Sequence, residues 1–162
     1  MAYPNSSVVG ANFATADAAP GNFAAMTVCN GSNDSLFVYC ETVGTFATGM
    51  CGLITTSGTA VAVSTCAGAL WADGMLGFIQ TSSTSGQFAW FAQRGINLYV
   101  GISATCNPSV ALYAGTTTPG YLTTTSLSST VAGVMLQAAT TTATVGPALA
   151  NLSWPRWNTA SM

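Results

Sequence analysis

The residue types that carry most enzyme chemistry are scarce in this chain of 162 residues. It contains no histidine and no lysine, so the base that activates the nucleophile of a hydrolytic triad is missing. The carboxylates are Asp17, Asp34, Glu41 and Asp73. A glycosidase needs two carboxylates about 5 to 9.5 Å apart, and the scattered positions of these four do not favour such a pair. We therefore expect no catalytic residues and no enzymatic activity.

Five cysteines are the other reactive groups. They are Cys29, Cys40, Cys51, Cys66 and Cys106. None forms a C-x-x-C pair, and the first three are spaced by eleven residues, which fits a strand plus a turn better than a set of zinc ligands. Free cysteine is among the most buried residue types. We interpret the cysteines as small buried side chains and predict neither a metal site nor a cofactor.

Charged residues make up only 4% of the chain, against about a quarter in ordinary soluble proteins. The two positive charges, Arg94 and Arg156, are too few to bind nucleic acid or an anionic membrane, so neither partner is expected. The uncharged stretch 42–72 is interrupted by Thr, Ser and Gly and does not read as a spanning helix. A net charge of −2 gives little repulsion between copies. The composition therefore predicts a surface that other subunits cover.

The elements that position these residues are expected to be strands. The most informative stretch is 86–100, where side chains alternate between two faces. One face carries Phe88, Trp90, Ala92 and Arg94, and the other carries Ala89, Phe91 and Gln93. After Gly95 the alternation restarts, with Ile96, Leu98, Val100 and Ile102 on one face. Gly95 is therefore predicted to mark a bend or bulge between two strands.

Apolar segments separated by turn residues predict further strands along the chain. They are 24–29, 35–43, 46–54, 60–65, 75–81, 109–113, 120–123, 131–137 and 148–154, with a helical turn as the alternative at 67–72. The turn 30–34 predicts a hairpin between the first two. Pro155 lacks the backbone donor of a central strand, so the tail should be an edge or leave the sheet.

No window shows a sustained helical period, and the chain contains no regular repeat. The fold class is therefore all-β, a small β-sandwich or β-barrel with an irregular N-terminal arm. We expect the arm or irregular lead-in at 1–22, a single β domain at 23–157 and a tail at 158–162.

Six residues are candidates for contacts between subunits. They are Trp90, Arg94, Tyr99, Trp154, Arg156 and Trp157. Tryptophan and arginine are enriched in interface hot spots, and few residues remain after Trp154 to cover the tail. For the aromatic residues near Trp90 a structural role is favoured over a ligand platform. Arg94 needs a partner if it is buried, and we expect Asp73, Glu41 or a neighbouring subunit to provide it.

Several short motifs follow one another along the second half of the chain. They are Trp90-Phe91-Ala92-Gln93-Arg94-Gly95, the alternating Ile96 to Ile102, Leu112-Tyr113-Ala114, Pro119-Gly120, Ala132-Gly133-Val134 and Leu152 to Trp157. Over residues 68 to 157 this order resembles the head decoration, or capsid cement, proteins of tailed bacteriophages. Residues 1 to 67 show no counterpart in that family.

The resemblance implies a small β-barrel or sandwich, commonly trimeric, that binds the major capsid protein on the outer face of an icosahedral head and stabilises it without catalysis. It also implies synthesis in the host cytoplasm, which agrees with the lack of a secretory signal at residues 1–5. Two alternatives stay open. One is a self-assembling lattice, tube or fibre subunit, and the other is a carbohydrate-binding adhesive domain with Trp90 or Tyr99 as its platform.

Overall fold

All regular elements among the described residues of the computed structural model are strands, which confirms the predicted all-β class. The structure describes residues 12–18, 20, 23–63, 74–103, 105–108, 110–115, 118–125, 129–140 and 145–159, with the side chains of 129 and 157–159 excepted. The strands are β1 (Val28–Asn30), β2 (Leu36–Val43), β3 (Cys51–Ile54), β4 (Thr59–Ala62), β5 (Met75–Ile79), β6 (Phe88–Ile102), β7 (Leu112–Ala114), β8 (Leu122–Thr123), β9 (Ser129–Leu136) and β10 (Gly146–Thr159).

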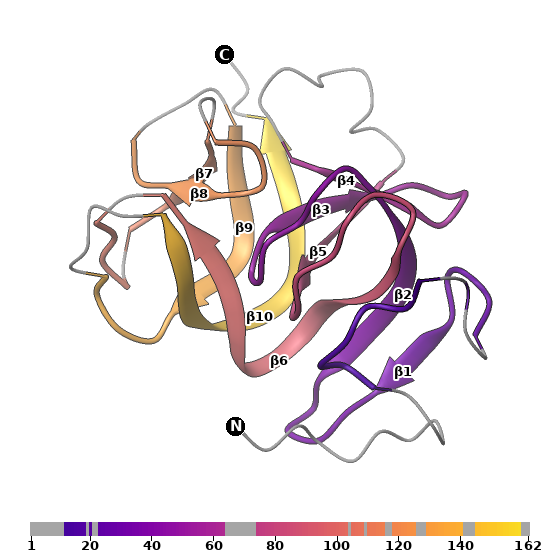
Figure 1. Cartoon of the computed structure of the whole chain (residues 1–162). Coiled ribbons are helices and arrows are strands. Elements are labelled where there is room, and N and C mark those ends of the chain that lie inside the picture. Colours follow the sequence, from indigo (N-terminus) through magenta and orange to yellow (C-terminus); the bar gives the residue numbers. More distant parts are fainter. Residues whose placement is uncertain are drawn as a thin grey trace.

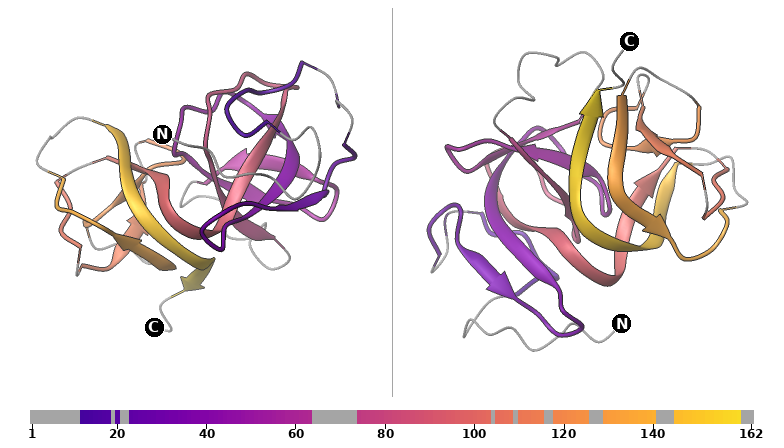
Figure 2. Two further views of the ribbon diagram at one scale, coloured as in Figure 1. Left: turned by 90° about the horizontal axis from the view of Figure 1, so that it is seen from below. Right: turned by 180° about the vertical axis from the view of Figure 1, so that it is seen from behind.

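The strands pair into two barrel-like rings that share β6 (Figure 1). The first ring runs β2-β4-β3-β5-β6 and returns to β2. The second runs β6-β10-β9-β7-β8 and returns to β6 through the single pair Ile102 and Leu122. Figure 2 shows the two rings side by side, with β1 outside the first ring, where it pairs only with β2. The hairpin predicted between β1 and β2 is confirmed.

β6 belongs to one ring with its first half and to the other with its second half. Residues 88–94 pair with β2, and residues 94–102 pair with β10. Arg94 lies opposite Leu36 of β2 and also opposite Ser153 of β10. Arg94 therefore marks the residue at which β6 passes from one ring into the next.

Two bulges let β6 make this passage. Against β2 the strand has one extra residue, Gln93, and against β10 it has one extra residue between Gly95 and Leu98. Gly95 and Asn97 have positive φ, +133° and +59°. The predicted irregularity at Gly95 is thus confirmed, although the strand continues through it. Each bulge reverses which face a side chain lies on, so the two together restore the original alternation.

Ile96 departs from the predicted pattern. It was expected on one face with Leu98, Val100 and Ile102, and those three are buried. Ile96 itself is 49% exposed, because it lies inside the second bulge, where the alternation is interrupted.

The interior of the first ring is filled around Phe91. All five strands contribute to it, together with Phe46 and Met50 from the connection before β3. A Cβ atom at Gly52 would lie 2.7 Å from Cε1 of Phe91, so the ring requires glycine at this position of β3. The strand predicted at 46–54 is accordingly shorter, since residues 47–50 turn inward and only Cys51–Ile54 form β3.

The second hydrophobic cluster joins the outside of the first ring to the inside of the second. Trp90 belongs to this cluster and is 1% exposed. Its ring makes edge contacts with the rings of Phe13 and Phe23, each at 5.4 Å between ring centroids. Phe13 also stacks on Phe37 at 4.2 Å. The described residues before 23 are therefore irregular but packed on the core. The domain boundaries stay a prediction.

β10 continues through Pro155 and keeps its pairing with β9. The register moves from Leu152 opposite Val134 to Arg156 opposite Ala132, so a bulge with two extra residues absorbs the proline. The pairing of β10 with β6 ends at Ser153. Beyond that residue β10 has one neighbouring strand, as the edge alternative predicted. The helical turn considered at 67–72, with Cys66 and Asp73, lies outside the described residues.

Replacing Gly95 with alanine should destabilise the fold by about 2 to 4 kcal/mol. A Cβ atom there would lie 2.6 Å from the Cβ of Ser35 and 2.9 Å from its Cα, at a φ that disfavours side chains. The free energy of unfolding in urea measures the effect. Gly146→Ala is the control, because a Cβ atom at Gly146 meets nothing within 4 Å. Equal stability of the two variants would contradict the account of the bulge.

Candidate interaction site

Arg94 connects the two rings at the point where β6 crosses between them. Its Nε donates to the backbone oxygen of Asp34 at 3.0 Å, and its Nη2 donates to Oδ1 of the same residue at 2.8 Å. The guanidinium also lies over the Trp154 ring, 5.6 Å from its centroid. Arg94 thus joins the β1–β2 turn to the bulge of β10.

The partner of Arg94 differs from the residues predicted. Asp73 and Glu41 were the candidates within the chain, and Asp34 makes the ion pair. Asp34 ends the turn before β2, and Leu36 lies opposite Arg94, so the register places the turn beside this side chain. Asp34 is 79% exposed, so we expect the pair to contribute about 0 to 1 kcal/mol.

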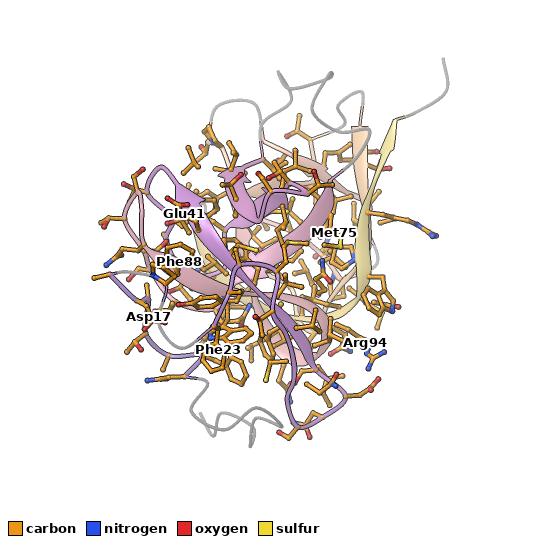
Figure 3. All side chains as sticks on the ribbon, turned by 90° about the vertical axis from the view of Figure 1, so that its right-hand side faces the viewer. Asp17, Phe23, Glu41, Met75, Phe88 and Arg94 are labelled. Atoms are coloured by element: carbon orange, nitrogen blue, oxygen red, sulfur yellow. The ribbon has the colours of Figure 1, made fainter. Side chains whose placement is uncertain are left out.

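Trp154 is held at the surface by its backbone. Its φ is +51°, it lies in the bulge of β10, and it is 50% exposed. Next to it is a pocket of about 320 Å³, lined by Gly74, Met75, Leu76, Gln93, Trp154, Pro155 and Arg156. Figure 3 shows Met75 and Arg94 on the same side of the molecule, beside the pale yellow ribbon of β10.

The pocket lies where β5 and β10 separate. β5 pairs with β6 at Phe78 and Ile79, and the pairing of β10 with β6 reaches Arg94. Gln93 therefore lies between the two ladders, with the start of β5 on one side and β10 on the other. The pocket thus lies between β5 and β10, at the point where both strands stop pairing with β6.

The structure brings together Arg94, Trp154 and Arg156 of the six predicted interface residues. Trp90 is buried in the core and has no surface to offer. The backbone of Tyr99 is held by the buried Gln80, which donates to its oxygen at 3.1 Å and accepts from its nitrogen at 2.9 Å. The side chain of Trp157 lies outside the described part of the structure.

A second exposed surface was not predicted. Met135 of β9 and Leu149 of β10 are 57% and 42% exposed on the outside of the second ring. Between these strands Gln137 donates to Asn97 at 2.7 Å and to Asn151 at 2.8 Å. The available signal was that both strands carry apolar residues on their outer face as well as on their inner one.

The cysteines offer no reactive group among the described residues. Cys29, Cys40, Cys51 and Cys106 are free and buried, which confirms their interpretation as core side chains. Burial raises the pKa of the Cys40 thiol to about 12 and also raises the pKa of Cys51 and Cys106. Within the described ranges no three His, Cys, Asp or Glu side chains are grouped to hold a metal ion.

No protein-family model, curated protein or solved structure matches this chain. In the ranges that the structure describes, no helix is long and apolar enough to cross a membrane. We therefore infer the function from the surface at the ring junction and from the resemblance in the sequence.

Alkaline pH should weaken the fold through the buried thiols. The folded state keeps the Cys40 proton up to a pH of about 12, whereas an unfolded cysteine loses it near pH ~8.5. The folded state thus binds more protons between these values, and the free energy of unfolding should fall by about 1.4 kcal/mol per pH unit for each such thiol. Urea unfolding at a series of pH values measures this slope.

Cys40→Ala is the control for this titration. It should cost stability at neutral pH, because it leaves a small cavity, but its free energy of unfolding should fall less steeply with pH. An identical slope for the variant and the parent chain would show that Cys40 does not contribute.

Proposed function

We propose that this chain is a non-catalytic structural subunit of a virion, which decorates and cements the icosahedral head of a tailed bacteriophage. One observation carries the proposal: large apolar side chains are exposed on a surface that has almost no charge. They are Val28, Val43, Val61, Met75, Ile96, Val110, Met135, Val145, Leu149 and Trp154. A free monomer with such a surface would tend to associate, so the subunit works by covering another protein.

The order of motifs from Trp90 to Trp157 supports the choice of a phage head over other assemblies. The partners are then the major capsid protein and further copies of this chain, with a trimer favoured. The place of action is the outer surface of the capsid, after synthesis in the host cytoplasm. Small β-domains suit this role, because backbone pairing gives them rigidity without a large core.

The carbohydrate-binding alternative named Trp90 or Tyr99 as the aromatic surface for a sugar. Trp90 is buried and cannot stack on a sugar ring, so Tyr99 is the candidate that is left. The self-assembling alternative predicts polymers of the isolated chain. Electron microscopy of the purified protein separates it from decoration, which predicts discrete small oligomers.

The variant Trp154→Ala should reduce occupancy on purified heads about tenfold or more, as expected for a central interface tryptophan. High salt should release little of the parent protein, because so few ion pairs are available to be screened. Quantitative mass spectrometry of heads washed at low and at high NaCl concentration measures both effects.

Val43→Ala is the comparison variant, since it shortens another exposed apolar side chain, 49% exposed at the opposite end of β2 from Leu36, and it should lower occupancy less than Trp154→Ala does. Circular dichroism establishes that both variants are folded. The proposal fails if the protein is absent from the heads or is lost at moderate NaCl. Unchanged occupancy of the folded Trp154→Ala variant would exclude this tryptophan from the interface.

A further inference from the structure

The pocket beside Trp154 contains a side-chain amide that no described protein group pairs with and that solvent reaches through the pocket. Gln93 is 3% exposed and lines the pocket, and its side-chain amide makes no hydrogen bond with any residue that the structure describes. The similarly buried Gln80 makes three, to Phe78 and Tyr99. Because the Gln93 amide is left to water in the pocket, a ligand that offers a donor and an acceptor can pair with it there in place of water.

The position of Gln93 explains how the amide reaches the pocket. Gln93 is the extra residue of the first β6 bulge, and bulges redirect side chains next to binding sites. On either side, the first residues of β5 and the part of β10 beyond Ser153 have no ladder partner toward the pocket among the strands that the structure describes. Two open strand edges with a free amide between them offer the donors and acceptors that an extended peptide uses.

The positive charge of the chain is concentrated at the same place. Arg94 and Arg156 are its two cations, and Trp154 lies beside both of them. Asp34 neutralises Arg94. Arg156 is exposed at the pocket, and its side chain has no ion pair with any described residue. Its guanidinium is therefore available for a carboxylate.

We propose that this pocket binds an extended acidic segment of a partner protein. The Gln93 amide pairs with a backbone amide of the segment, Arg156 binds an Asp or Glu carboxylate, and an apolar side chain packs against Trp154 and Met75. This inference rests on the proposed function, for which it supplies the chemistry of the contact with the partner. A volume of about 320 Å³ has room for only a few side chains, and its lining is mostly apolar, which suits a short peptide better than a sugar.

The test is a titration of the full-length, nitrogen-15-labelled protein with two capped peptides, followed by NMR. The probes are acetyl-Thr-Val-Asp-Leu-Thr-amide and the same peptide with Asn in place of Asp. The Asp peptide should shift the side-chain signals of Gln93, Trp154 and Arg156, and it should bind about tenfold more tightly than the Asn peptide. Two arginines in the chain make the Arg156 Nε signal simple to assign.

Three variants separate the parts of the site. Arg156→Gln should remove the preference for Asp over Asn, and Gln93→Leu should weaken both peptides while keeping that preference. Gln137→Leu, which changes an amide outside this pocket, should leave both affinities unchanged. The NMR spectrum itself shows whether each variant is folded.

Three results would overturn the inference: equal affinity for the two peptides, no shift with about 5 mM peptide, or shifts with glucuronate but with neither peptide. The proposed function is tested separately on heads. Full occupancy together with no peptide binding would refute the acidic segment and leave head decoration standing. Peptide binding by a protein that is absent from heads would refute head decoration and leave the binding of an acidic segment standing.

Discussion

The double use of β6 is the constraint on which the rest of the structure depends. In its first half both faces are buried, with Phe91 inside the first ring and Trp90 against its outside. In its second half Val100 fills the core of the second ring. The rings cannot separate without losing the ladders of β6 to β2, β5 or β10. Gly95 and Asn97 are needed because a regular strand could not change neighbours within so few residues.

The sequence predicted what depends on local alternation. Residues 88–92 carry apolar groups on both faces, and their alternation predicted the strand that the structure contains. The partner of Arg94 could not be predicted in the same way, because Asp34 lies 60 residues away and approaches only through the register of β2 on β6. The exposure of Ile96 depends on which strand supplies the extra residue, and the burial of Trp90 depends on Phe13 and Phe23 covering it.

The junction of the rings is also where the chain places its rare charges. Arg94 is held from the β1–β2 turn and in turn supports the face of Trp154, while Arg156 stays available. The bulges that let β6 and β10 change direction also put Gln93 into a pocket and Trp154 at the surface. The same departures from regular strand geometry thus serve both the fold and the proposed contact surface, without any reactive group.

The central claim is that the function of this chain lies at a boundary with another protein, at the Trp154 pocket. A cryo-electron microscopy map of intact phage heads assembled with this chain, the particle that the proposed function calls for, tests this most directly. The account predicts density for the double ring on the outer surface, with an extended segment of a neighbouring protein between the start of β5 and β10. Heads without this density, or with the pocket open to solvent in every copy, would contradict it.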